Sequence, residues 1–383
     1  MMKVAFLAAA WLASFAPAIA GEDAANRLLI AQTELAISLL NGLAESKADN
    51  ILLSPSTLGA ALGVAALGAS DAGRAAIAAS LGFGQDAQGP IRILDAAPGG
   101  EALKTAAAIV FDDGLRLQDT ATALLAEHRL QPDIQPLSSP ATVGKINAWV
   151  ADATSGAIQT ILDAPPGGDF VSLGALSFKA RWKTEFQKDS QSAPFLKAGG
   201  SEISVPMMRL SGTTQRFRID ERFAAVDLAY ADEAYRMVVV AARSGKGLTA
   251  TETGDLAPWL RAEGFADAPG DVQMPRFAMT DGRDLLPHLE RLGLATLRSQ
   301  KHVFSGFTEA SVQLAAVVQK VMVSVDETGT QAAAATAVTT ERSIDTKLVR
   351  VTANGRFLFA LRDVRSGLLL AVGLIGDPLS SGR

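Results

Sequence analysis

A run of small, uncharged residues near the C-terminus constrains this chain more than any other stretch. Residues Val325 to Ile344 read VDETGTQAAAATAVTTERSI, with an acidic pair, Asp326 and Glu327, ahead of the run from Gln331 to Thr340. Alanine favours helices, but Gly329 and the threonines on both sides disfavour a stable one. Composition alone is typical of a linker. Because its side chains are small enough to enter a packed sheet, the sharper interpretation is an exposed segment that can later become a buried strand.

The N-terminus has the pattern of a secretory signal peptide. Lys3 precedes an apolar run from Val4 to Phe15, and Ala18-Ile19-Ala20 is the small-x-small pattern, ahead of Gly21, that signal peptidases cut. About twelve apolar residues are too few to span a bilayer comfortably. We expect residues 1–20 to be removed and residues 21–383 to form one domain, secreted or periplasmic, with no membrane partner.

The composition suits a large folded core and argues against nucleic acid as a partner. Hydrophobic residues make up 48% and charged residues 20% of the 383 residues. The formal net charge is −5 without a long basic run, whereas phosphate binding needs a concentrated positive face. The chain contains no cysteine, so an exported domain of this size must depend on its core rather than on disulfides.

Helix and strand patterns both occur along the chain. Ser54-Pro55 is an N-cap followed by proline at the first helical position, and it opens a helix of unusually small side chains. Residues 170–179 are almost continuously apolar, which predicts a strand covered on both faces. Residues 82–100 are rich in glycine and proline and predict a loop. Further expected strands include residues 203–207, 215–219 and 312–325, and a helix is expected around residues 283–292.

The motifs of common enzyme classes are missing from the sequence. It has no Walker or Rossmann glycine loop, no His-Glu-x-x-His and no Gly-x-Ser-x-Gly. His128, His288 and His302 are scattered at no metal-ligand spacing. We therefore expect no metal, no cofactor and no enzymatic activity. A Ser-His-Asp triad can assemble from distant positions, so a secreted hydrolase remains an alternative.

Several separated segments resemble the signature blocks of the serpin family of serine protease inhibitors, in serpin order. The blocks are NILLSPS at 50–56, INAWV at 146–150 continuing to TSGAI at 154–158, FKARW at 178–182, MPRF at 274–277, FSG at 304–306 and ETGTQAAAAT at 327–336. The last, which resembles the family's hinge, is the most specific. Since the blocks cover essentially the whole chain after the signal, it is identified as a member of the serpin family, expected to be a bacterial secreted one.

The resemblance implies a fold, a mechanism and a set of site residues. The fold is α+β, with three β-sheets, eight or nine helices and an exposed reactive-centre loop at about residues 326–345. The mechanism is inhibition of a serine protease, which attacks the loop and forms an acyl-enzyme before the freed hinge enters the central sheet as a new strand. The implied hinge residues are Glu327, Gly329, Thr330, Ala332, Ala333, Ala334, Ala335 and Thr336. The implied sheet-opening residues are Ser54, Ser56, Gly174, Trp182 and Gln319.

The hinge residues permit that insertion. In a strand, alternate side chains face the same way, so Thr330, Ala332, Ala334 and Thr336 would all turn toward the core. All four are small and uncharged. Noninhibitory serpins often have bulky, charged or proline residues there, so we favour inhibition over a binding or chaperone role. The expected partner is a target serine protease in a covalent acyl complex with the monomer.

The sequence leaves two candidates for the reactive bond. Arg342-Ser343 resembles an arginine-serine reactive bond and suits a trypsin-like specificity pocket with a buried aspartate. The usual hinge length, counted from Glu327, instead places the cut after Ser343, before Ile344, which would favour an elastase-like protease.

The chain also departs from the family pattern. The family's asparagine in the central strand falls on Gly174, and the histidine that pairs with it falls on Gln319, so the polar latch under the sheet is rebuilt or absent. Ala180 replaces a usual glycine and Arg356 a usual proline. Residues 82–100, where many relatives have a glycosaminoglycan-binding helix, contain a single basic residue, Arg92. We therefore expect no heparin-type cofactor.

Overall fold

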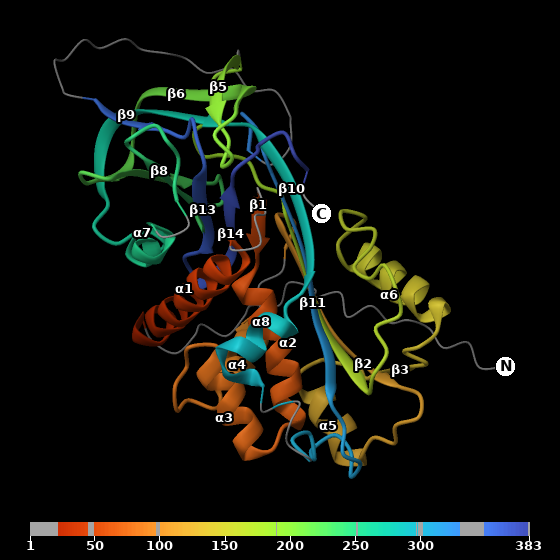
Figure 1. Cartoon of the computed structure of the whole chain (residues 1–383). Helices are drawn as coiled ribbons and strands as arrows, with labels where there is room; N and C mark the ends of the chain where they lie inside the picture. The colour runs from red at the N-terminus through yellow and green to blue at the C-terminus, as the bar shows by residue number, and fades with distance from the viewer. Residues whose placement is uncertain are drawn as a thin grey trace. The chain divides into compact units, whose positions relative to one another are not determined.

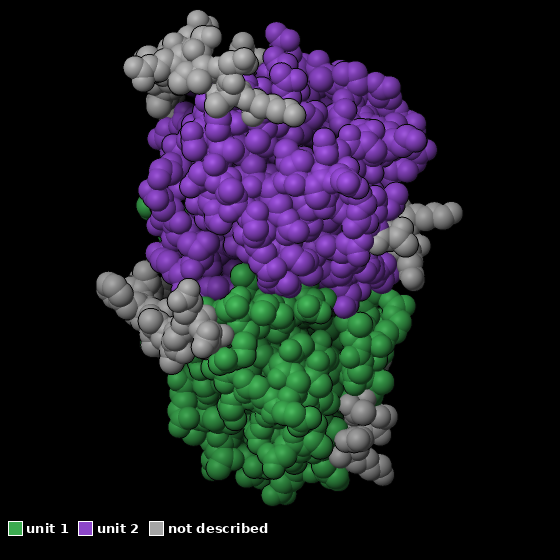
Figure 2. Space-filling model, turned by 90° about the vertical axis from the view of Figure 1, so that its left-hand side faces the viewer, with its two compact units in different colours: residues 1–35, 54–177, 281–322 green, residues 36–53, 178–280, 323–383 purple. Residues whose placement is uncertain are grey.

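The computed structural model describes residues 22–44, 50–96, 100–188, 190–249, 252–295, 297, 302–329 and 348–381 (Figure 1). The chain divides into two compact units, coloured separately in Figure 2. Unit 1 comprises Met1–Leu35, Ser54–Ser177 and Asp281–Met322, and unit 2 comprises Ala36–Leu53, Phe178–Thr280 and Val323–Arg383. The single domain expected over residues 21–383 stays a prediction. The expected signal peptide lies outside the described residues.

The described residues contain eight α-helices, in agreement with the expected number. They are α1 (Glu22–Ala44), α2 (Pro55–Gly68), α3 (Asp71–Ser80), α4 (Gly89–Ala96), α5 (Asp119–Glu127), α6 (Pro140–Ala153), α7 (Ala257–Leu260) and α8 (Leu286–Leu289). A 3-10 helix, η1 (Glu252–Leu256), precedes α7, and a π-helical turn, η2 (Glu290–Leu294), follows α8. No helix among these described residues is long and apolar enough to cross a membrane.

Fourteen strands are described, and they form two hydrogen-bonded sheets. The strands are β1 (Asn50–Leu53), β2 (Leu103–Asp112), β3 (Asp133–Gln135), β4 (Phe170–Phe178), β5 (Gln191–Leu196), β6 (Glu202–Ile219), β7 (Phe223–Ala229), β8 (Tyr235–Ala242), β9 (Ala266–Pro275), β10 (Phe277–Asp284), β11 (Leu314–Val325), β12 (Val349–Thr352), β13 (Phe357–Asp363) and β14 (Leu368–Ile375).

The smaller sheet, most of whose residues belong to unit 1, has five strands in the order β10-β11-β4-β2-β3. Helices α6 and α2 lie on opposite sides of it (Figure 1). On one side, Val171 and Leu173 of β4 share an apolar cluster with Ile146 and Val150 of α6. On the other, the Ser172 hydroxyl donates to a carbonyl of α2. Alternate residues of β4 thus face different helices, which explains the continuous apolar content that predicted this strand.

Helix α2 begins as the sequence predicts. The Ser54 side chain accepts a hydrogen bond from the backbone N–H of Thr57, and Pro55 occupies the first turn. All fourteen residues of α2 are buried, so small side chains are needed on every face. Glycine spacing lets a neighbouring helix approach closely, since a Cβ at Gly63 would lie 3.1 Å from the Cβ of Leu94 in α4.

That neighbouring helix corrects the loop expected over residues 82–100. Residues Gly89–Ala96 form α4. Its side chains Ile93 and Leu94 are buried, with no more than 1% of either exposed. The helix is short, and its apolar side chains gain stability by packing on the glycines of α2, a long-range partner that local composition does not show. A helix was expected around residues 283–292, and α8 together with η2 covers Leu286–Leu294. The helical segment starts later than expected because β10 continues to Asp284.

The sheet of unit 2 contains nine strands. Its main path is β1-β14-β13-β8-β7-β6-β9-β12, with β5 added on β6. Residues Glu202 to Met207 of β6 pair with β5, and Arg216 to Ile219 pair with β7, so one long strand joins two groups of strands that the expected fold counts as separate sheets. The two short strands predicted at 203–207 and 215–219 are therefore parts of one 18-residue strand.

Candidate functional site

The centre of the five-stranded sheet is closed in this structure. Strands β11 and β4 are hydrogen-bonded neighbours, and the described residues place no strand between them. The small-residue segment follows β11 directly, after the turn that ends at Gly329. Residues 330–347 lie outside the described residues, and with them the predicted hinge positions from Thr330 to Thr336 and both candidate bonds at Arg342 and Ser343.

Beneath the sheet, Gln319 of β11 forms a buried polar latch with the start of α2. Its Oε1 accepts from the backbone N–H of Ser54 at 2.8 Å, and its Nε2 donates to the Ser54 carbonyl at 2.7 Å and to the Thr57 hydroxyl at 3.0 Å. The Ser54 and Ser56 hydroxyls also lie 3.2 Å apart. Gln319 is 3% and Ser54 0% exposed, so these bonds are shielded from water. The polar latch under the sheet was expected to be either rebuilt or absent, and these hydrogen bonds support a rebuilt latch.

The other departure, Gly174 of β4, takes no part in those bonds because it has no side chain. A Cβ at this position would lie 2.9 Å from the carbonyl oxygen of Thr57 and 3.3 Å from the Thr57 Cβ. Glycine therefore lets β4 approach α2 closely. The latch of this chain joins β11 to α2, and β4 contributes backbone contact alone at Gly174.

In unit 2, the predicted hinge residue Glu327 is held by an ion pair. One guanidinium nitrogen of Arg276, Nη2, donates to both carboxylate oxygens, at 2.7 and 2.6 Å, and the Ser190 hydroxyl donates to Oε1. The Glu327 residue is 6% exposed. Sequence reasoning did not single out Ser190. Arg276 stands within the MPRF block, and an arginine there is the signal that could have identified the partner.

The predicted sheet-opening residue Trp182 lies beside this ion pair in unit 2. Its ring stacks on Tyr230 with ring centres 4.2 Å apart and planes at 17°. Its indole N–H donates to the backbone carbonyl of Asp326 at 2.9 Å. Trp182 is 3% exposed and Tyr230 fully buried. The structure thus brings Trp182, Glu327 and Gly329 together, while Ser54, Ser56, Gly174 and Gln319 gather in unit 1.

The ion pair changes the acidity of Glu327. Burial alone raises the pKa of this carboxyl, but hydrogen bonds from Arg276 and Ser190 outweigh burial and hold the pKa below its ordinary value of 4.5. A carboxyl whose pKa is lower in the folded than in the unfolded chain contributes stability above its unfolded pKa. That contribution is lost as the pH falls through the folded-state pKa.

We therefore expect Glu327→Gln to lower the midpoint of thermal unfolding at pH 7, with the gap to wild type closing as the pH falls below about 4.5. Thermal unfolding followed by circular dichroism across this range measures the gap. The exposed Glu309 offers a matched control, since it has no ion partner among the described residues, and Glu309→Gln should show no such trend. A gap for Glu327→Gln that stays constant from pH 7 to pH 3 would contradict the assignment.

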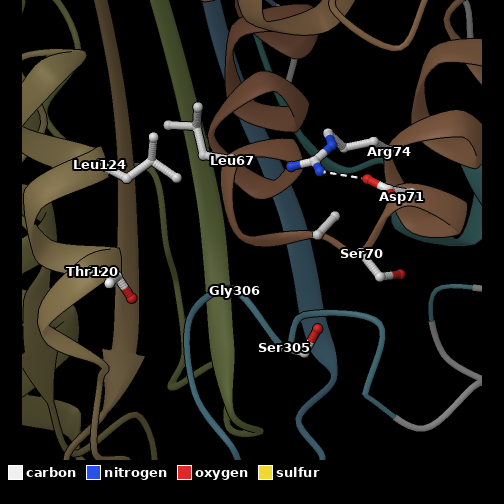
Figure 3. Close-up of a pocket in the computed structure, with 9 residues that line it drawn as sticks. Leu67, Ser70, Asp71, Arg74, Thr120, Leu124, Ser305 and Gly306 are labelled. Atoms are coloured by element: carbon white, nitrogen blue, oxygen red, sulfur yellow. Dashed lines mark hydrogen bonds and ion pairs between the residues drawn. The ribbon is translucent and has the colours of Figure 1, made fainter.

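A pocket of about 520 Å³ in unit 1 gives no support to the hydrolase alternative (Figure 3). Asp71 and Arg74 in its wall pair with each other at 2.7 Å, and the Ser70 side chain caps α3. The lining includes the hydroxyls of Ser70, Thr120 and Ser305 but no histidine. A nucleophile with an adjacent base, which hydrolysis of this kind requires, is not assembled in this lining.

Comparisons with known proteins agree with the sequence blocks. The family model described as Serpin (serine protease inhibitor) matches residues 30–378. Iripin-3 of the tick Ixodes ricinus is 28% identical over 391 residues, covering 96% of this chain and 98% of its own length. Other curated relatives come from human and from the jellyfish Cyanea capillata, so these matches do not support the expected bacterial origin.

Solved structures show the same fold at low sequence identity. Serpin48 of the insect Tenebrio molitor has a TM-score of 0.79 at 20% identity, over 92% of this chain and 98% of its own. Human thyroxine-binding globulin, solved as a complex with thyroxine, has a TM-score of 0.80 at 20% identity, over 93% of this chain and 100% of its own. The expected α+β serpin fold is thereby confirmed, although the described strands form two sheets rather than the expected three.

Proposed function

Because the chain belongs to the serpin family, whose model matches residues 30–378, we propose that it is a suicide-type inhibitor of serine proteases rather than an enzyme. The protease serine attacks a loop carbonyl, the peptide bond breaks, and the released amine departs while an ester still joins the two proteins. The freed hinge then adds to the central sheet as a new strand between β4 and β11. The protease is carried along before it can hydrolyse the ester.

One observation carries this proposal: β4 and β11 are neighbours although a small-residue segment able to separate them follows β11. The sheet is therefore one strand short of what the chain can supply. A strand of about 15 residues extends roughly 50 Å, enough to move a bound protein across a domain. With roughly 1 kcal/mol net for each added ladder hydrogen bond, insertion releases on the order of 10 kcal/mol. The uncleaved state is then less stable than the inserted state and persists because a kinetic barrier slows insertion.

We assign the reactive bond to Arg342-Ser343 and the target to the trypsin-like class, with an elastase-like target cut after Ser343 as the alternative. An arginine side chain fills a trypsin-like pocket through charge-assisted hydrogen bonds, each worth about 1.5–3 kcal/mol. The residues 1–20 support export to the secreted or periplasmic compartment, and action as a monomer is part of the same proposal.

Incubation with trypsin and with elastase, read on a denaturing gel, tests the proposal. We expect a covalent complex with trypsin, and we expect Arg342→Ala to slow its formation about tenfold or more, since the charged hydrogen bonds are lost. Arg350→Ala on β12 is the matched control, because Arg350 is exposed and should leave complex formation unchanged. Mass spectrometry of the released C-terminal peptide should show Ser343 as its first residue. A peptide beginning at Ile344, with Arg342→Ala as fast as wild type, would favour the elastase assignment.

A noninhibitory binding role is the second candidate, and the likeness to thyroxine-binding globulin is the observation that favours it. At 20% identity this likeness concerns the fold, and the small hinge residues of this chain favour inhibition. The same gel separates the two roles. A binding protein would be cleaved or ignored by both proteases and would leave no covalent complex.

A further inference from the structure

The chain does not continue from β11 as an extended strand but turns sharply at Asp326–Gly329. The backbone N–H of Asp326 donates to the carbonyl of Gly329 at 2.7 Å, and the N–H of Gly329 donates back to the Asp326 carbonyl at 3.2 Å. The Asp326 side chain reinforces the turn, because its Oδ1 accepts from the Thr328 N–H at 2.9 Å, the Thr328 hydroxyl at 2.8 Å and the Gly329 N–H at 3.1 Å.

The carbonyls of this turn accept hydrogen bonds from the segment that follows β4. The Asp326 carbonyl accepts from the Trp182 indole, the Thr328 carbonyl accepts from the Trp182 backbone N–H at 3.0 Å, and the Glu327 carbonyl accepts from the Phe186 N–H at 2.8 Å. We call the turn Asp326–Gly329, together with Trp182 and Phe186, the hinge clamp. All of its members belong to unit 2.

Gly329 closes the clamp by direct backbone contact. It pairs with Arg181 in an isolated antiparallel bridge, and a Cβ at position 329 would overlap the carbonyl oxygen of Ala180. Its φ is +135°, whereas strands have φ near −120 to −140°. Residues 326–329 can therefore join a strand continuous with β11 only after the turn bonds break and Gly329 leaves its place.

We propose that Asp326 is a positioning residue that holds the first loop residues in the hinge clamp and thereby sets the rate at which the loop inserts. This inference rests on the proposed function. Among the side chains of the turn, Asp326 bonds the turn to itself through three acceptor contacts, whereas Glu327 bonds to Arg276 and Ser190 outside it. Loss of the Asp326 carboxylate therefore loosens the turn while the Glu327 ion pair stays in place.

The test compares three variants by two measurements that need no protease. Asp326→Ala removes all three acceptor contacts, and Asp326→Asn keeps a carbonyl oxygen at the same place. Asp267→Ala removes one exposed carboxylate from unit 2 as a control for charge. The first measurement is amide hydrogen exchange at Thr328 and Gly329. The second is the rate at which uncleaved protein, held at raised temperature, converts to a heat-resistant form that has inserted its own loop.

We expect both rates to rise about tenfold or more in Asp326→Ala, because several hydrogen bonds to a charged group are lost. Asp326→Asn should show a smaller rise, because its amide oxygen keeps the acceptor position but not the charge, and Asp267→Ala should stay close to wild type. Unchanged exchange in Asp326→Ala would overturn the assignment of the turn. Faster exchange with an unchanged conversion rate would overturn the control of insertion.

Covalent capture of trypsin and elastase by the same variants separates this inference from the proposed function. If no variant captures either protease but Asp326→Ala still speeds exchange and conversion, the inhibitory function is wrong and the hinge clamp stands. If wild type and Asp326→Ala both capture protease with identical exchange and conversion rates, the clamp is wrong and the inhibitory function stands.

Discussion

Under the proposed mechanism, Ala334→Glu is expected to turn the chain from an inhibitor into a substrate. In the proposed inserted strand, position 334 would face the core in the same row as Thr330, Ala332 and Thr336. An unpaired carboxylate there costs several kcal/mol, whether it is buried charged or must first take up a proton. Insertion then slows or stalls, so the protease hydrolyses the ester and leaves with full activity. The denaturing gel should show cleaved chain and free protease in place of the covalent complex.

The control for this variant introduces a small, uncharged side chain at the same position. Ala334→Thr should still form the complex, because threonine already stands at two positions of the same row and fits a buried strand. Both variants should be cut at the same bond and at similar initial rates, since position 334 lies well before the reactive bond. Covalent complex formation by Ala334→Glu at the wild-type stoichiometry would show that the trap does not depend on burial of the hinge.

The parts of the fold that sequence could predict are those set by local pattern. Residues 170–179 were predicted as a doubly covered strand from their continuous apolar content, and β4 runs from Phe170 to Phe178 with every residue buried. The start of α2 was predicted from Ser54-Pro55, whose capping bond is local. Residues 312–325 were expected as a strand, and β11 runs from Leu314 to Val325. In each case the signal lies within a few residues of the element.

Features that depend on distant partners were missed or left open. Helix α4 exists because Ile93 and Leu94 pack on α2, and composition over residues 82–100 shows the glycines but not that contact. Strand β6 is continuous because β9 pairs along it from Met207 to Phe217, across a local shift in register after Leu210. Such pairings follow from the assembled sheet and are invisible in the residues of β6 alone.

The candidate site divides in the same way. The family pattern identified Gln319 and Gly174 as departures but not their consequence, since Gln319 reaches Ser54 across 265 positions of sequence. In the sequence, Asp326 is recognisable only as one of the two acidic residues that precede the small-residue run. Its three contacts depend on the turn that Gly329 makes possible. Sequence alone could place the hinge after β11, but it could not show that the hinge begins in a clamp.

The latch around Gln319 and the hinge clamp around Asp326–Gly329 have different roles in the proposed inhibitory mechanism. Gln319 joins β11 to α2 by three buried bonds and lies within unit 1, so it stabilises the closed sheet. The hinge clamp lies within unit 2 and holds the start of the loop. The expected departures from the family pattern, Gly174 and Gln319, lie at the latch, whereas Glu327, Gly329 and Trp182 of the other site lie in segments that resemble the family blocks.

Thermal unfolding of the intact and the loop-cleaved chain tests the central claim, loop insertion, most directly. A metalloprotease that cuts within residues 337–343 forms no acyl intermediate, so it cleaves the loop without being trapped. Insertion of about 15 residues adds on the order of 10 kcal/mol of stability. The unfolding midpoint should therefore rise by roughly 10 °C or more on cleavage. A midpoint that stays the same or falls, with the loop fully cut, would contradict insertion and with it the inhibitory mechanism.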